Sequence, residues 1–103
     1  MSKYRSNLFI PGHTLDRLEK AQGSNADAII VDLEDGCPEA EKLVARETLI
    51  SLLKEKAFTK PLFVRVNDAM EALGREDIDS ISPYQDQIEA IILPKTQSFD
   101  SED

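Results

Sequence analysis

The sequence lacks the residues that stabilise most small secreted domains. It contains a single cysteine, Cys37. One cysteine excludes an internal disulfide and fits a reducing compartment, so we expect a cytoplasmic protein. No apolar run approaches the roughly 20 residues needed to span a bilayer. The apolar run that follows segment 1–5 is also too short for a secretory signal peptide.

Positive charge is also scarce. The 103 residues include 12 lysines and arginines against 20 acidic residues, which gives a formal net charge of −8 at pH 7. An acidic surface does not attract nucleic acids or anionic membranes, so neither is expected as a partner. The length suffices for one small domain and not for two.

Short apolar runs alternate with helical patterns along the chain. We predict four strands, at Asn7–Ile10, Ala28–Leu33, Leu62–Val66 and Ala90–Leu93. Helices are predicted from an N-cap at Thr14 to Gly23, from Pro38 to about Lys56, and within the acidic stretch before the last strand. Strands separated by helices imply right-handed crossovers and a parallel sheet, so the predicted fold class is α/β.

The helix from Pro38 has the clearest pattern. Its apolar residues at helical spacing, which should face the sheet, are Ala40, Leu43, Ile50 and Leu53. The last residues, 96–103, have the pattern of a loop followed by a helix N-cap at Ser98 or Asp100, with no helix behind it. We therefore interpret the 103 residues as a fragment of a larger domain.

Polar residues gather where the predicted strands end. The segment AIIVDLEDG passes from branched apolar residues to Asp32, Glu34 and Asp35, and polar or turn-forming residues follow the other three strands. Parallel strands present their carboxyl ends at one edge, where α/β folds bind ligands, so the pattern indicates a site. Acids at this position also cap the following helix, and for each acid both interpretations are open.

Arg65 is the most informative single residue. It lies between two valines in an apolar strand, so its side chain should share a face with Phe63 and Asn67. A guanidinium there needs an anion, because an unpaired buried charge is very costly. The anion is either Asp32 or Glu34 of the neighbouring strand, or a carboxylate or thioester oxygen of a substrate.

Three other polar residues have simpler interpretations. Lys95 is expected to form a salt bridge or bind an anion, and not to form a Schiff base. His13 has no serine or cysteine partner nearby and is interpreted as a loop residue. Cys37, which precedes Pro38, is interpreted as a small residue at a helix start and not as a nucleophile.

Six segments occur in order at plausible spacing: RSNLFIPG from Arg5, DRLEKA from Asp16, ADAIIVDLEDG from Ala26, AR at Ala45-Arg46, FVRVN from Phe63 and IILPK from Ile91. With them the chain resembles, over nearly its whole length, the N-terminal part of the citrate lyase beta subunit family. That family belongs to the HpcH/HpaI aldolase superfamily, which also contains malyl-CoA lyases. The resemblance implies a TIM (β/α)8 barrel, typically about 250 residues long, of which residues 1–103 supply the first four βα units and stop before the fourth helix.

The resemblance also implies an activity. This is Mg²⁺-dependent cleavage or formation of a carbon–carbon bond in a short 2-oxo or hydroxy acid, or in its acyl-CoA or acyl-carrier thioester. Arg65 matches an arginine that holds the carboxylate or carbonyl oxygen of the substrate, which makes it the expected catalytic residue. Phe9 and Lys20 match positions close to the CoA and complete the expected substrate-binding set.

The acids of the AIIVDLEDG segment have a supporting role in this resemblance. Asp32, Glu34 and Asp35 match residues that organise the site around Arg65 and the metal-bound water without binding the ion directly. No metal ligand is expected within the chain, because the family's metal-binding Glu and Asp fall beyond residue 103. In one departure, similar proteins often carry Arg at the position of Thr14, which argues against a CoA-type nucleotide.

Two alternatives to a lyase fragment follow from the same residues. The chain is alternatively a catalytically inactive remnant that acts as an oligomeric or ligand-binding module. A phospho-acceptor signalling domain is disfavoured, because its acids would follow the first strand and not the second. In either remaining case, unpaired strand edges at 7–10 and 90–93 and an uncovered apolar inner face predict a homo-oligomer.

Overall fold

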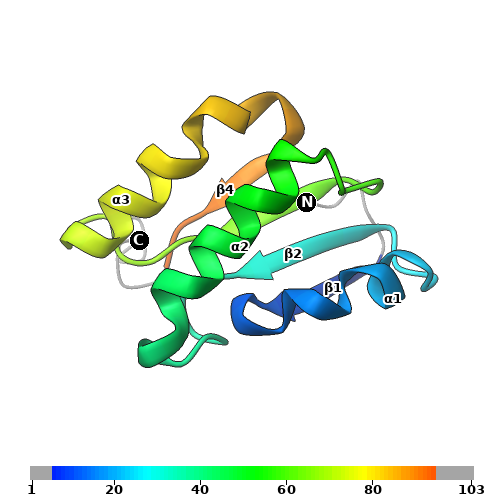
Figure 1. Cartoon of the computed structure of the whole chain (residues 1–103), viewed down its shortest axis with the longest axis horizontal. Coiled ribbons are helices and arrows are strands. Elements are labelled where there is room, and N and C mark those ends of the chain that lie inside the picture. The colour runs from blue at the N-terminus through cyan, green and yellow to red at the C-terminus, as the bar shows by residue number, and fades with distance from the viewer. Residues whose placement is uncertain (1–5, 95–103) are drawn as a thin grey trace, which may run out of the picture.

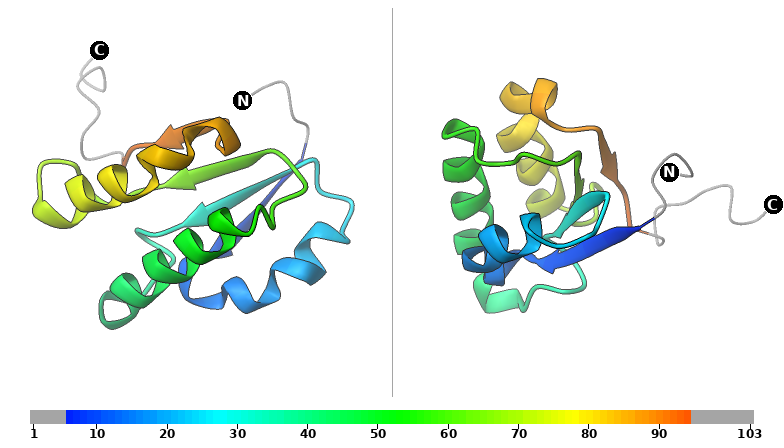
Figure 2. Two further views of the ribbon diagram at one scale, coloured as in Figure 1. Left: turned by 45° about the horizontal axis from the view of Figure 1, so that its top comes forward. Right: turned by 90° about the vertical axis from the view of Figure 1, so that its right-hand side faces the viewer.

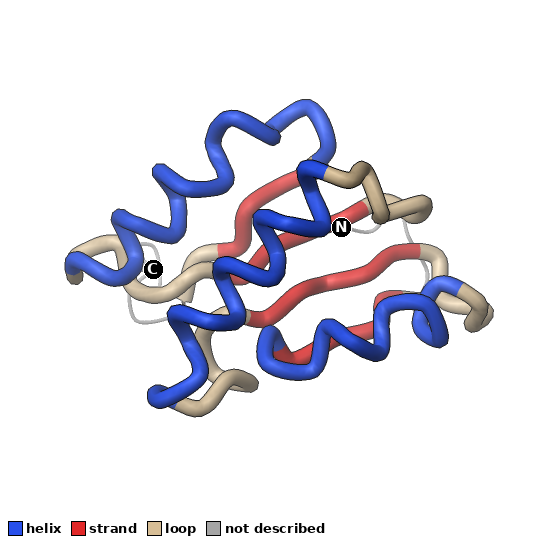
Figure 3. Tube along the Cα trace, in the orientation of Figure 1, coloured by secondary structure: helices blue, strands red, loops and turns tan. Residues whose placement is uncertain are grey.

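The computed structural model describes residues 6–94, and strands and helices alternate throughout (Figure 3). The strands are β1 (Asn7–Pro11), β2 (Ala28–Asp32), β3 (Leu62–Arg65) and β4 (Ala90–Ile92) (Figure 1). The α-helices are α1 (Leu18–Gln22), α2 (Lys42–Lys54) and α3 (Ala72–Ile81). Short 3-10 helices adjoin them, at η1 (Gly12–Arg17), η2 (Glu39–Glu41) and η3 (Ser82–Gln87). The predicted strands are confirmed to within two residues at each end, and the predicted helix before the last strand is α3. The expected cap at Ser98 or Asp100 lies outside the described residues.

The four strands form one parallel sheet in the order β1-β2-β3-β4, as predicted for an α/β fold. The described helices all cover the same face of this sheet (Figure 2). Beneath them lies the main core, whose largest fully buried side chains include Ile29, Leu33, Leu49, Leu53, Leu62 and Ile81. The arrangement is that of the first strands of a TIM barrel, in which the helix-free face of the sheet becomes the interior.

The buried face of α2 differs from the predicted one. Its buried residues are Ala45, Leu49 and Leu53. Leu43 is 56% exposed, and Ala40 is exposed and precedes the α-helix, in η2. The prediction counted the helical period from Pro38, but Pro38 and η2 turn the chain before α2 begins at Lys42. The phase of the apolar pattern is therefore displaced, and of the predicted positions only Leu53 is fully buried.

The first helical segment also begins differently from the prediction. Thr14 is not an N-cap, because its hydroxyl donates a hydrogen bond to the carbonyl oxygen of Pro11 at 2.9 Å. Its φ of −120° interrupts η1, which already starts at Gly12. A threonine hydroxyl can satisfy a nearby carbonyl as well as a helix N–H, and here the carbonyl is the partner. Gly23 follows the end of α1, as predicted.

The helix-free face of the sheet is apolar at its centre. The cluster there consists of Ala28, Ile30 and Phe63, with Ile92 packed against it. The prediction of an uncovered inner face is wrong at this centre, because Ile30 and Phe63 are only 2% and 5% exposed. Side chains from neighbouring strands pack against one another on this face. Exposed apolar side chains occur instead at the edge strands, where Phe9 on β1 is 51% exposed.

The two edges of the sheet predict self-association. In the described part of the chain β1 and β4 each pair on one side only, and β4 presents Ile91 at 38% exposure. We expect the 103-residue chain to sediment as a dimer or larger species. Ile91→Lys should shift it toward a monomer, since a lysine on an edge strand blocks pairing with another chain. Val44→Lys, at an exposed apolar position of α2, should leave the association unchanged. A wild-type chain that stays monomeric at high concentration would contradict the prediction.

Gly74 is required by the packing of α3 against the end of β3. A Cβ at this position would overlap the backbone carbonyl oxygen of Asp68. Alanine favours a helix interior by about 1 kcal/mol over glycine, but forcing α3 away from the loop should outweigh that gain. We expect Gly74→Ala to lower the free energy of unfolding by about 2 kcal/mol net. Chemical denaturation measures this.

The matched control for this substitution is Gly23→Ala. A Cβ at Gly23 would lie 3.6 Å from its nearest neighbour, the carbonyl oxygen of Lys20, which is an ordinary contact. We expect Gly23→Ala to change the free energy of unfolding by less than about 0.5 kcal/mol. Equal free energies of unfolding for the two variants would show that the loop between β3 and α3 shifts to admit the Cβ without loss of stability.

Candidate functional site

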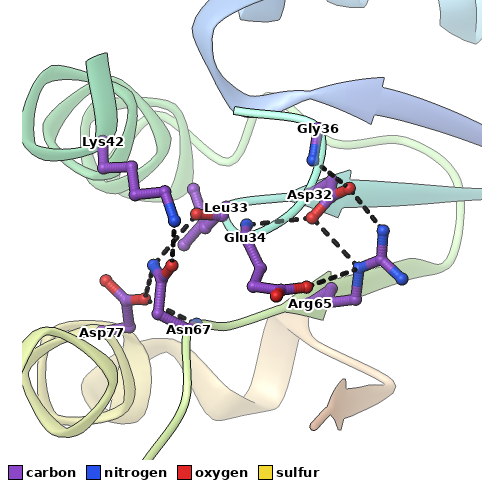
Figure 4. A network of polar contacts seen from close by, with 8 residues as sticks. All are labelled: Asp32, Leu33, Glu34, Gly36, Lys42, Arg65, Asn67 and Asp77. Atoms are coloured by element: carbon purple, nitrogen blue, oxygen red, sulfur yellow. Dashed lines mark hydrogen bonds and ion pairs between the residues drawn. The ribbon is translucent and has the colours of Figure 1, made fainter. Parts of the chain in front are cut away.

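Asp32 and Arg65 form an ion pair at the carboxyl end of the sheet. They are register neighbours at the ends of β2 and β3. Arg65 Nη2 donates to Asp32 Oδ2 at 2.6 Å, and Arg65 Nε donates to Asp32 Oδ1 at 3.1 Å (Figure 4). A contact through two nitrogens fixes the plane of the guanidinium as well as its position.

The loop after β2 wraps around the same carboxylate. The backbone N–H groups of Glu34 and Gly36 donate to the two Asp32 oxygens at 2.9 Å and 2.8 Å. A Cβ on Gly36 would lie 2.8 Å from Asp32 Oδ2, so the sharp approach of this loop requires glycine. Each carboxylate oxygen of Asp32 therefore accepts one hydrogen bond from Arg65 and one from the backbone of the loop.

These contacts keep both members of the pair charged. Burial raises the pKa of Asp32, but the Arg65 hydrogen bonds and the two backbone N–H groups together outweigh it, and the net pKa lies below the ordinary value. The hydrogen bonds to Asp32 raise the pKa of Arg65, against the opposing effect of burial. Both effects favour the ionised pair over the neutral one.

The other two predicted acids interact with Arg65 less directly. Glu34 Oε1 lies 3.8 Å from Arg65 Nε, at ion-pair distance. Asp35 is exposed and acts on Arg65 through its charge. Of the two partners considered for Arg65 from the sequence, the neighbouring strand thus supplies an anion. Among residues 6–94, however, no acceptor contacts Arg65 Nη1. Within the described part of the chain, both N–H groups of that nitrogen are thus without an acceptor.

Phe9 is the third residue around this guanidinium. Its ring centroid lies 5.5 Å from Arg65 Cζ, which is a cation–π distance. Phe9 also lines a groove of about 660 Å³ between β1 and the helix beside it, and Lys20 lines the same groove. The structure therefore brings Phe9 and Lys20 to one groove but places only Phe9 against Arg65.

Asn67 was predicted to share the face of Arg65, and this is wrong. The Asn67 side chain turns to the helix-covered side. There its Nδ2 donates to Asp77 Oδ2 at 2.6 Å, and its Oδ1 accepts from Lys42 Nζ, also at 2.6 Å. β3 ends at Arg65, so the alternation of a strand no longer governs residue 67. Sequence reasoning missed Asp77, because an acid within an acidic stretch carries no sign that it is buried.

The remaining candidates contribute little to the site. His13 is exposed in η1. Cys37 is buried, and burial raises the pKa of its thiol, so it is protonated at neutral pH and poorly nucleophilic. Lys95, the expected anion-binding lysine, lies outside the described residues.

The donor set of the site does not by itself fit a divalent cation. Mg²⁺ prefers an octahedron of oxygens with at least one or two carboxylates. Asp32 already accepts four hydrogen bonds, two of them from a cation. Within residues 6–94 no cluster of three or more His, Cys, Asp or Glu side chains is arranged to hold a metal.

In the same part of the chain, none of the helices has the length and apolar character that crossing a membrane requires.

The sequence pattern of the HpcH/HpaI aldolase/citrate lyase family matches residues 5–101. The chain belongs to this family. The match includes the β2 loop and Arg65, so the resemblance inferred from six short segments is confirmed. It also includes all four strands of the sheet, which are strands of the family's TIM barrel.

Individual members are similar over most of the chain but are much longer. A (3S)-malyl-CoA thioesterase of Cereibacter sphaeroides is 40% identical over 96 residues, which are 92% of this chain and 33% of the relative. A citrate lyase subunit beta-like protein of Deinococcus radiodurans is 32% identical over 98 residues, which are 90% and 34% of the two chains. The chain thus spans about a third of the length of the curated relatives it matches.

A solved structure agrees with the fold. The protein CitE of Mycobacterium tuberculosis, in complex with magnesium, acetoacetate and coenzyme A, superimposes with a TM-score of 0.70 at 28% identity. The alignment covers 95% of this chain and 35% of CitE.

Proposed function

We propose that this chain is the N-terminal third of a carbon–carbon lyase of the citrate lyase beta type. The enzyme would carry out an aldol or Claisen-type cleavage or condensation of a short 2-oxo or hydroxy acid, or of its acyl-CoA or acyl-carrier thioester. The observation that carries this proposal is the geometry of Arg65. Asp32 holds it through two nitrogens at the carboxyl end of the sheet, and Nη1 has no acceptor among the described residues. Membership of the family and the name of the Deinococcus relative support the same reaction class, whereas the Cereibacter relative is named as a thioesterase.

The proposed chemistry needs an anchored cation. When the carbon–carbon bond breaks, negative charge develops on the carbonyl oxygen of the leaving enolate. Arg65 would donate from Nη1 to that oxygen or to a substrate carboxylate. Because Asp32 orients the guanidinium before the substrate binds, little reorganisation is needed as the charge develops. Glu34 and Asp35 would help to keep Arg65 charged and oriented.

Two further residues are proposed to bind substrate. Phe9 contacts Arg65 and lines the groove that also contains Lys20. A thioester chain lying in this groove would reach the guanidinium past the Phe9 ring, with Lys20 available for an anionic group of the carrier. The complex of CitE with coenzyme A supports a carrier of this kind.

Mg²⁺ is the proposed cofactor, with its ligands supplied by segments beyond residue 103. The CitE complex contains magnesium, which supports this assignment. A cytoplasmic homo-oligomer is the proposed setting, supported by the single buried cysteine and the apolar strand edge.

The test is the mass and activity of the protein as it occurs in its own cell. We expect an intact mass close to that of a full barrel of about 250 residues. With Mg²⁺, this protein should convert malyl-CoA into acetyl-CoA and glyoxylate, which mass spectrometry detects directly. Malate and free CoA would instead identify a thioesterase, as in the Cereibacter relative. A protein that ends at residue 103 and forms neither product pair would establish the alternative, an inactive binding module.

A further inference from the structure

A buried carboxylate behind the Asp32–Arg65 pair has no part in the proposed chemistry. Asp77, in α3, is only 1% exposed. Its Oδ2 accepts hydrogen bonds from Asn67 N at 3.0 Å and from Asn67 Nδ2 at 2.6 Å, and its Oδ1 accepts one from Arg46 Nη1 at 3.1 Å. Removing one member of such a set leaves the others unpaired in the interior, which is much more costly than the same loss at the surface.

Asn67 extends the pairing of β2 and β3 beyond the ends of the strands. The Leu33 N–H donates to the Arg65 carbonyl oxygen at 2.8 Å, as in a strand ladder. One step further along, the Asn67 side chain donates from Nδ2 to the Leu33 carbonyl oxygen at 2.9 Å. Leu33 directly follows Asp32 in the sequence. The ion pair is therefore adjacent to a clamp on Leu33. Arg65, the last residue of β3, holds the Leu33 N–H, and Asn67, two residues further along, holds the Leu33 carbonyl oxygen.

Two helices join this clamp. Lys42, the first residue of α2, donates from Nζ to Asn67 Oδ1 at 2.6 Å, and Arg46 of the same helix pairs with Asp77. Figure 4 shows Lys42, Asn67 and Asp77 on one side of Leu33 and the Asp32–Arg65 pair on the other. The start of α2 and the middle of α3 are thus tied to the ends of β2 and β3, the two strands that carry the pair.

We propose that Asp77 is a positioning residue for Arg65. It orients the Asn67 amide, which holds Leu33 and so keeps Asp32 and Arg65 in register where the strands end. Its catalytic consequence rests on the proposed function, but the effect on the geometry of Arg65 does not. A purely structural Asp77 would change only the overall stability of the chain.

The experiment measures hydrogen exchange of the Arg65 Nε–H, which donates to Asp32, by nitrogen-15 NMR of the 103-residue chain. The exchange rate of the Val31 amide, at the centre of β2, is recorded in the same sample as a measure of overall opening. In Asp77→Asn we expect the ratio of the Arg65 rate to the Val31 rate to rise about tenfold, because local opening at the strand ends becomes easier. Lys42→Met should raise the same ratio by a smaller factor.

Glu76→Gln is the matched control. Glu76 is the neighbour of Asp77 and also pairs with Arg46, at 3.4 Å, but its side chain is 60% exposed, and its one hydrogen bond in this network is to Arg46, not to Asn67. The rate ratio should stay at the wild-type value in this variant. If both rates rise in parallel in Asp77→Asn, the positioning role is refuted. If Asp77→Asn does not fold, an unchanged ratio in Lys42→Met refutes it. These exchange measurements do not test lyase activity, which is assayed separately.

Discussion

Asp32→Asn is expected to lower the free energy of unfolding by about 3 kcal/mol, because it leaves Arg65 without its counter-charge. The asparagine side chain has one oxygen in place of two, so it cannot accept from Arg65 and from both backbone N–H groups of the β2 loop. Breaking a well-buried pair costs more than this figure, but Arg65 is 27% exposed and water can partly solvate it. Urea denaturation of the two chains, at equal concentration, measures the difference.

The matched control is Asp35→Asn, which removes the same charge from an exposed side chain three residues away. It should change the free energy of unfolding by less than about 0.5 kcal/mol. If Asp32→Asn proves as mild as Asp35→Asn, the ion pair does not stabilise the end of the sheet.

The stability difference between the wild type and Asp32→Asn should also depend on pH in the acid range. The pKa of Asp32 is lower in the folded chain than its ordinary value of 3.8. Its contribution to stability is therefore complete above that value and is lost as the pH falls through the lower pKa of the folded state. The difference in free energy of unfolding between wild type and Asp32→Asn should shrink over that acid range. A difference that does not vary with pH would place the effect in packing and not in charge.

Arg65→Lys in the full-length protein is expected to cost about 2–4 kcal/mol of transition-state stabilisation. The loss should appear as a lower kcat/KM, mostly through kcat. Lysine keeps the charge but loses the planar fork with which Arg65 holds Asp32 through Nε and Nη2 while Nη1 has no acceptor among the described residues. A single ammonium cannot keep both geometries. Steady-state kinetics with the thioester substrate separate the effect on kcat from that on KM.

The control for this substitution is Arg75→Lys, which makes the same change at an arginine of α3 whose contacts are long hydrogen bonds to the carbonyl oxygens of Ala69 and Met70. Turnover of this variant should stay near that of the wild type. Near-normal turnover of Arg65→Lys would show that Arg65 serves only as the partner of Asp32.

The positions of the strands and the location of the candidate site were predictable from the sequence, because the information is local. Four short apolar runs end at turn or polar residues, and strands separated by helices join in parallel. Parallel strands bring their carboxyl ends to one edge, so Asp32 and Arg65 had to end near one another. The alternation of side chains along β3 also placed Arg65 on the face opposite the two valines that flank it, and the structure shows that the valines lie in the core beneath the helices.

Tertiary structure decided what each of those side chains contacts. The choice between an ion pair and a free cation at Arg65 depends on the register of two strands that are 33 residues apart in sequence. The buried face of α2 depends on where η2 ends and α2 begins, which displaced the apolar pattern predicted from Pro38. The periodicity within one segment predicts whether it forms a helix or a strand. It does not fix which of its residues face a neighbouring segment.

Asn67 and Asp77 show the same limit most clearly. By itself the sequence places Asn67 at a strand end and Asp77 among other acids, with nothing to distinguish it from its exposed neighbour Glu76. Only the crossover that lays α3 against the end of β3 buries Asp77 and directs its carboxylate at Asn67. Once desolvated, that carboxylate must be fully paired, and Asn67 and Arg46 provide the donors.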